Sequence, residues 1–200
     1  MTKPSVPSWF ASAPSVPNSE LEDDITQVLA EVEEKSGFVP NVFRLLARQP
    51  AQFRAFFAYH DSLMEQECSL SKAEREMIIV ATSGANFCLY CVVAHGAILR
   101  IRSKNHRLST QIATDFERAE ISERQKAMLR FAMRVSKDAP SIGVGDFASL
   151  YQEGFTDDDI WVIGSLASFF AMSNRLAGFT GLRPNEEFYD MGMPPNKLSH

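Results

Sequence analysis

The sequence predicts an all-α protein, folded as a helical bundle, on three observations. Hydroxyl residues followed three positions later by Glu or Gln recur along the chain, a pattern typical of helix N-termini that form a capping box. The segments that follow them place apolar residues at the three- and four-residue spacing of an amphipathic helix. No convincing run of alternating apolar and polar residues indicates a strand.

The first predicted helix begins near Glu20, with Ser19 and Glu22 as its capping box, and ends at Gly37. Glycine is favoured there because it accepts the left-handed conformation that follows many helix ends. A short helix at 42–48 comes next. Pro50 then opens a longer helix, since proline suits a first helical position. Its apolar stripe consists of Phe53, Phe56, Phe57 and Leu63.

Ser71 and Glu74 predict the start of a helix that should lie at the centre of the bundle. Its run 77–81 is apolar nearly all round, which is typical of a helix covered on every side. Gly84 and Asn86 interrupt this helix. Asn86 is a reasonable N-cap for the next helix, which carries two cysteines and a histidine.

The second half of the chain is predicted to be helical as well. Ser122 with Gln125 forms another capping box. The segments 70–74 and 155–159 look alike, because both begin an apolar helix with a hydroxyl cap and a carboxylate. They indicate either an internal helical repeat or two ordinary capped helices. The predicted helices are Ser109–Ala119, Glu123–Ser136, Asp146–Glu153 and Asp157–Phe179.

Length, charge and composition limit the kind of protein this is. At 200 residues the chain has room for one domain. We predict a Pro/Ser-rich extended arm at 1–19, the helical domain at 20–185 and a tail at 186–200. The net charge of −5 comes without a basic stripe, which argues against nucleic acid as a partner.

Neither a membrane span nor secretion is expected. No apolar run reaches the ~18 residues that a membrane span needs, and the N-terminus lacks the apolar core of a signal peptide. Three cysteines do not make a disulfide framework. The sequence therefore predicts a cytoplasmic protein that does not bind membranes.

Cys88, Cys91 and His95 form the most informative pattern in the chain. Their spacing of i, i+3 and i+7 places all three on one face of a helix. Two thiols this close in a reducing compartment are more often catalytic or metal-binding than a structural disulfide. The pattern therefore marks a candidate reactive site.

Thiol redox chemistry is the reaction type that this set favours. A thiol reacts as its thiolate, which the positive end of a helix dipole stabilises. The second sulfur can then close a disulfide on the oxidised first sulfur. His95 can accept the thiol proton directly or through one water. Glu76, twelve residues before Cys88, is the candidate carboxylate that orients His95.

Two other interpretations of this set stay open. Cysteine and histidine are also the usual zinc ligands, with Glu76 as the available fourth ligand. The cysteines could instead be buried and inert. Covalent haem attachment requires a histidine directly after the second cysteine, where Val92 stands. We predict neither a metal nor a cofactor.

The remaining reactive or aromatic residues are expected to have ordinary structural roles. Cys68, just before a helix cap, is interpreted as a spare reduced thiol. His60 and His106 are interpreted as surface or helix-end residues. The other expectations are core packing for Phe169 and Phe170, and helix-to-helix contacts for Asn174 and Arg175.

At four positions the sequence resembles a known family. The pattern Glu-x11-Cys-x2-Cys-x3-His is that of the AhpD-like alkylhydroperoxidases, within the carboxymuconolactone decarboxylase-like superfamily. Later segments are similar to the branch called peroxidase-related proteins, so that the resemblance covers roughly residues 20–185. The segments that carry it are Glu76, Cys88, Cys91, His95, Ile121–Leu129 and Asn174–Ala177.

The resemblance implies a helical bundle that forms homo-oligomers and a peroxidase mechanism. Cys91 would attack hydrogen peroxide or an organic hydroperoxide and become a sulfenic acid. Cys88 would resolve it as a disulfide, which an external dithiol or thiol reductant would reduce. His95 and Glu76 would form the proton relay. One departure is Tyr90, which stands where the best-known AhpD proteins carry a second histidine.

Two other functions compete with a thiol-dependent peroxidase. One is a non-enzymatic redox-sensing protein whose disulfide state changes its assembly. The other is a cofactor-free lyase of the carboxymuconolactone decarboxylase type. The lyase branch does not depend on a cysteine pair, so the presence of both thiols with Glu76 and His95 counts against it.

Overall fold

The computed structural model describes residues 21–194, and within them it contains ten α-helices and no strand, which confirms the all-α prediction. The predicted arm at 1–19 lies outside the described residues, as does the segment 195–200. The helices are α1 (Asp23–Ser36), α2 (Asn41–Ala47), α3 (Pro50–Glu65), α4 (Lys72–Ala85), α5 (Leu89–Ser103), α6 (Leu108–Asp115), α7 (Glu123–Asp138), α8 (Val144–Gln152), α9 (Asp157–Thr180) and α10 (Glu187–Asp190).

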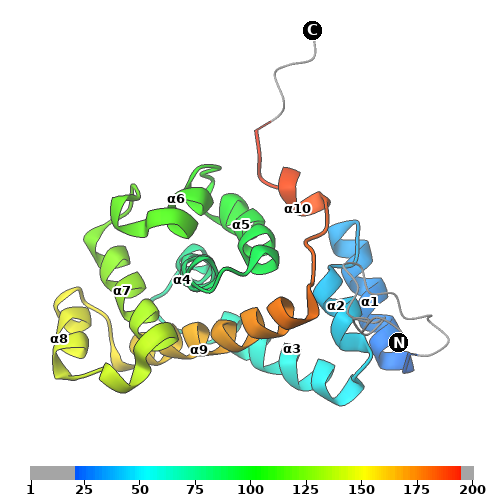
Figure 1. Ribbon diagram of the computed structural model, residues 1–200, viewed down its shortest axis with the longest axis horizontal. Coiled ribbons are helices and arrows are strands. Elements are labelled where there is room, and N and C mark those ends of the chain that lie inside the picture. The colour runs from blue at the N-terminus through cyan, green and yellow to red at the C-terminus, as the bar shows by residue number, and fades with distance from the viewer. Residues whose placement is uncertain (1–20, 195–200) are drawn as a thin grey trace, which may run out of the picture.

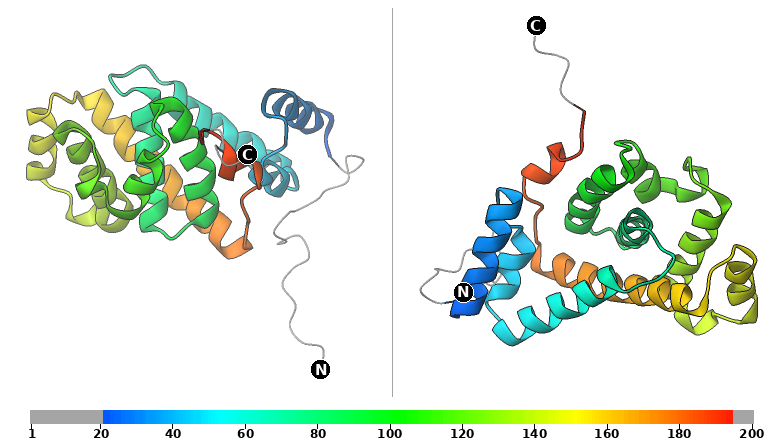
Figure 2. Two further views of the ribbon diagram at one scale, coloured as in Figure 1. Left: turned by 90° about the horizontal axis from the view of Figure 1, so that it is seen from above. Right: turned by 180° about the vertical axis from the view of Figure 1, so that it is seen from behind.

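Helix α4 lies at the centre of the bundle, as its apolar sequence predicts. Figure 1 shows α5, α6, α7 and α9 arranged around it. Met77, Ile78, Ile79 and Val80 are at most 1% exposed, because neighbours cover every face of this helix. The helices α1 to α3 lie at one end of the molecule and α8 at the other (Figures 1 and 2). The candidate thiols follow this central helix directly.

Helix α9 is the longest helix, and it lines the core next to α3, α4 and α7. Within residues 21–194 it is the one helix long and apolar enough to cross a bilayer by length and composition. However, 61% of its most apolar window is buried within the fold. Its apolar face, which includes Ile163, Leu166 and Phe170, therefore packs against other helices.

Three predicted capping boxes are present at the starts of α4, α7 and α9. In each, the N-cap hydroxyl accepts the third residue's N–H, while that residue's side chain accepts the N-cap N–H. Gly37 ends α1 in the left-handed conformation, at φ 82°. These local signals alone therefore fix several helix ends.

Two predicted helix starts were wrong. Helix α1 begins at Asp23 with Glu22 as its N-cap residue, so Glu22 is not the third residue of a box. Asn86 ends α4, whereas Cys88 caps α5. Phe87 between them adopts φ 55°, which turns the chain sharply from one helix into the next. This turn places a sulfur atom, and not an amide, at the start of α5.

The segment that begins at 186, expected to be a tail, packs on the body through α10 and Met191. Phe188 of α10 meets Phe38 edge to face, with ring centroids 5.0 Å apart. The Arg100 guanidinium donates hydrogen bonds to the carbonyls of Phe188 and Met191, at 2.6 and 2.8 Å. These contacts attach α10 to α5.

Candidate functional site

Glu76 and His95 meet where α4 packs against α5. The Nδ1 atom of His95 lies 2.9 Å from Oε2 of Glu76. The Glu76 side chain is 4% exposed and that of His95 16%, so solvent screens this pair weakly. A carboxylate that accepts Nδ1–H leaves the Nε2 lone pair free to take a proton. The structure thus brings together the two residues predicted to form the relay.

Cys88 and Cys91 lie on the first turn of α5. The backbone N–H of Cys91 donates to Sγ of Cys88 at 3.4 Å, so the thiol sulfur fills the role that a hydroxyl oxygen has in other caps. Both cysteines are buried, and both are free thiols. Of the hydrogen bonds among the described residues, none joins His95 to either sulfur.

The two thiols differ in acidity because each affects the other. A hydrogen bond from the Cys91 thiol lowers the pKa of Cys88 to about 7, although burial opposes this shift. The Cys91 N–H, Asn174 and His95 lower it further. The same hydrogen bond, together with burial, raises the pKa of Cys91. The two thiols therefore titrate as a coupled pair, in which the pKa of Cys88 is lowered and that of Cys91 is raised.

Asn174 of α9 is a site residue whose role in the site the sequence analysis missed. Its Nδ2 donates to Ser83 Oγ at 2.9 Å, and its Oδ1 accepts from Asn86 Nδ2 at 3.0 Å. These bonds hold helices together, as expected, and they also fix which end of the amide faces which neighbour. Asn174 in addition lowers the pKa of both thiols.

Tyr90, the departure from the AhpD pattern, has a structural partner. Its phenolic oxygen accepts the backbone N–H of Val42 at 3.2 Å, which ties α5 to the start of α2. Burial raises the pKa of this phenol. Tyr90 therefore supplies no base in place of the family's second histidine.

His60 was expected to be a surface residue, but it lies beside the site. Its ring centroid is 6.2 Å from that of Phe170, which meets the His95 ring edge to face at 4.8 Å. Burial lowers the pKa of His60, and the charge of His95 lowers it as well, whereas Asp61 raises it. Phe170 thus separates two imidazoles, and the Phe170 ring belongs both to the core and to the site.

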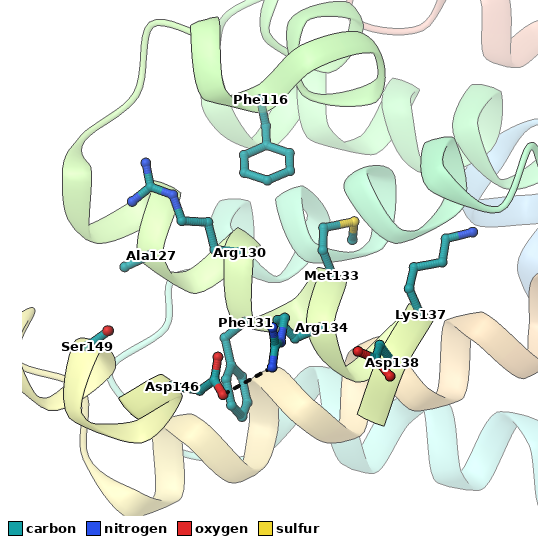
Figure 3. Close-up of a pocket in the computed structure, with 10 residues that line it drawn as sticks. All are labelled: Phe116, Ala127, Arg130, Phe131, Met133, Arg134, Lys137, Asp138, Asp146 and Ser149. Carbon is teal, nitrogen blue, oxygen red and sulfur yellow. Dashed lines mark hydrogen bonds and ion pairs between the residues drawn. The ribbon is translucent and has the colours of Figure 1, made fainter. Parts of the chain in front are cut away.

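Two further observations concern metal binding and a pocket away from the four predicted residues. Among the described residues, no group of three or more His, Cys, Asp or Glu side chains is placed to hold a metal ion. A pocket of about 490 Å³ along α7 and α8 contains none of the four predicted residues (Figure 3). Its Arg134–Asp146 pair, 3.5 Å apart, is a surface ion pair.

Comparisons with known proteins agree with this geometry. The model of the carboxymuconolactone decarboxylase family matches residues 50–105, a range that includes Glu76, Cys88, Cys91 and His95. A search of curated proteins gave no match. The solved structures give longer matches.

Two peroxidase-related proteins of uncharacterised function are similar over almost the whole chain. The protein from Ralstonia eutropha JMP134, described as an alkylhydroperoxidase AhpD core, is 51% identical, with a TM-score of 0.90; the match covers 94% of this chain and 98% of that one. The protein from Silicibacter sp. TM1040 is 37% identical, with a TM-score of 0.86; the match covers 96% of this chain and all of that one.

A more distant similarity concerns the fold alone. The debrominase Bmp8, solved with 2,3,4-tribromopyrrole, is 16% identical, with a TM-score of 0.74; the match covers 90% of this chain and 94% of that one. By contrast, the sequence identity to the two peroxidase-related proteins is high and extends over almost the whole chain, which establishes a common ancestry with them. The chain belongs to the AhpD-like superfamily, together with the peroxidase-related proteins.

Proposed function

We propose that the protein is a thiol-dependent peroxidase that reduces hydrogen peroxide or organic hydroperoxides. The observation that carries the proposal is the Glu76–His95 hydrogen bond of 2.9 Å, next to two buried free thiols on the first turn of α5. A base oriented by a carboxylate beside a nucleophile is the arrangement that activates thiols and hydroxyls in enzymes. The peroxidase-related descriptions of the two relatives support the same reaction class.

Cys91 is proposed as the attacking thiol, because His95 follows it by one helical turn. Its thiolate attacks one peroxide oxygen; an S–O bond forms and the O–O bond breaks. The leaving oxygen takes up the proton that the thiol gave to the relay and departs as water or an alcohol. The sulfur becomes a sulfenic acid, so the peroxide gains two electrons.

Cys88 is proposed as the resolving thiol. Its sulfur attacks the sulfenic sulfur; an S–S bond forms and water leaves with the Cys88 proton. An external dithiol then reduces the disulfide by thiol–disulfide exchange and becomes a disulfide itself. Since the hydrogen bond between the thiols and burial raise the pKa of Cys91, the proposed mechanism requires the Cys91 proton to move to Cys88 or, through water, to His95.

Stopped-flow oxidation of the reduced protein by cumene hydroperoxide tests this proposal. We expect rapid loss of two mass units, with tryptic peptides that join Cys88 to Cys91. The variant Cys68→Ser is the matched control, because Cys68 lies outside the pair and should leave rate and product unchanged. Oxidation no faster than that of a free thiol would reject the peroxidase and favour the redox-sensing function.

A further inference from the structure

Two adjoining hollows lie at the surface, and one of them reaches the Cys88 thiol. The smaller, about 230 Å³, is lined by Cys88. The larger, about 460 Å³, is lined by Asn174, which affects the pKa of both thiols. Phe87 and Gly178 line both hollows, so the two adjoin, and together they are called the depression. Its size suits a small organic molecule better than hydrogen peroxide alone.

The rim of this depression is cationic. Lys137 and Arg175 line the larger hollow and Arg183 the smaller, and the described residues that line them include no Asp or Glu. In a chain with a net charge of −5, this is a local reversal of sign. Elsewhere the arginine side chains are commonly paired with carboxylates, as at Arg54, Arg124, Arg130 and Arg134.

The rim cations keep donors available for a ligand. Lys137 donates to the backbone carbonyl of Ala85, and Arg175 to that of Ala171. Each bond uses one of the three donors of an ammonium or the five of a guanidinium. Figure 3 shows the Lys137 side chain extending away from the carboxylates of Asp138 and Asp146. Among the ion pairs of the described residues, none joins Lys137 to either carboxylate.

The apolar part of the same surface is aromatic. Phe87 is 93% exposed, and Phe179 lines the larger hollow beside it. Phe87 also adopts φ 55°, a backbone conformation that is unfavourable for a bulky residue. Its exposure leaves a large apolar ring in water as well. Phe87 and Phe179 together give the larger hollow an exposed aromatic side.

We propose that this depression is a subsite for organic hydroperoxides that carry an anionic group. The inference rests on the proposed peroxidase function and adds the substrate class. The hydroperoxide group enters beside Cys88, one helical turn before Cys91, the hydrocarbon body lies on Phe87 and Phe179, and the carboxylate pairs with Lys137 and Arg175. Arg183 adds positive potential at the mouth beside Cys88.

The test compares cumene hydroperoxide with its para-carboxylate, which differs from it by one anionic group. At low ionic strength we expect the carboxylate to oxidise the thiols about tenfold faster, the factor that a modest charge interaction supplies. The preference should fall as salt is added, because the rim is exposed to solvent. The double variant Lys137→Met, Arg175→Gln should bring the ratio of the two rate constants close to one.

Arg118→Gln is the control, since this exposed cation lies outside the depression and should leave the ratio unchanged. The subsite inference fails if the unmodified protein gives equal rate constants for the two hydroperoxides. It also fails if the preference for the carboxylate persists in the double variant or at high salt. In these cases the proposed peroxidase function still stands. If the double variant does not fold, the salt dependence of the unmodified protein still decides. If neither hydroperoxide oxidises the thiols, the proposed peroxidase function fails, and the subsite inference fails with it.

Discussion

The N-termini of α9 and α5 share a backbone arrangement but carry different capping chemistry. At α9, Thr156 and Asp159 form a capping box, and the Asp159 carboxylate also accepts the Ser69 N–H at 2.7 Å. At α5, the Cys88 sulfur accepts one N–H at 3.4 Å and lies next to a second thiol. At α9 the positive end of the helix dipole stabilises a carboxylate and so the fold, whereas at α5 the same dipole can stabilise a reactive thiolate.

At both helix ends one capping-motif residue, Asp159 or Cys88, has a lowered pKa, with different consequences. Burial alone would raise the pKa of Asp159, but hydrogen bonds from Thr156 and Ser69 outweigh it and lower the pKa. Asp159 is therefore charged at any neutral pH. The pKa of Cys88, at about 7, leaves thiol and thiolate both populated near neutrality. A helix end thus becomes reactive only when its capping group titrates within the working pH range.

The largest effect should come from the thiols. Cys91→Ser should abolish oxidation by cumene hydroperoxide, because the attacking sulfur is gone. Cys88→Ser should allow one oxidation, with a sulfenic acid on Cys91 that dimedone traps and that excess peroxide oxidises further. Labelled-peptide mass spectrometry checks both variants. A dimedone adduct on Cys88 in the Cys91→Ser variant, formed at the normal rate, would reverse the two roles.

The next largest effect should come from the relay. His95→Gln removes the base that Glu76 orients, and we expect thiol oxidation to slow by on the order of 10²–10⁴-fold. His106→Gln is the matched control, because His106 is exposed and lies outside the site. Stopped-flow traces across pH check the result. An unchanged rate in the His95 variant would exclude the histidine from the relay.

Asp159→Asn should have the smallest effect. It should change the stability of the protein and not the rate of thiol oxidation. The amide cannot replace a carboxylate that accepts hydrogen bonds from Thr156 and Ser69, so we expect a loss of about 1–2 kcal/mol in the free energy of unfolding. Urea denaturation measures this loss. The rate constant of thiol oxidation should stay the same, and a marked change in it would contradict the separation of the two helix ends.

This variant should also alter the pH dependence of stability. Folding lowers the pKa of Asp159, so its contribution is complete above the unfolded pKa of about 3.9 and disappears as pH falls through the lower folded value. The difference in stability between the variant and the unmodified protein should therefore shrink in acid. A difference that stays constant down to pH ~2 would exclude ionisation as its cause.

Glu74 and Glu76 show how far the sequence alone could go. The capping box identifies Glu74 locally, three residues after Ser71, and the structure confirms it. Nothing local distinguishes Glu76; its place on the helix before Cys88 made it a candidate, and the resemblance to a family strengthened the prediction. Its hydrogen bond to His95 depends on how α4 packs against α5, a contact between residues 19 positions apart.

By itself, the sequence determined the helical class and most helix ends, and it predicted one shared face for the thiols and His95. These are consequences of near-neighbour spacing and of side chains that bond to their own backbone. Tertiary structure decided that Cys88 and not Asn86 caps α5, that Asn174 reaches the thiols and that His60 lies beside Phe170. Each of these depends on contacts between helices distant in sequence, which local spacing does not encode.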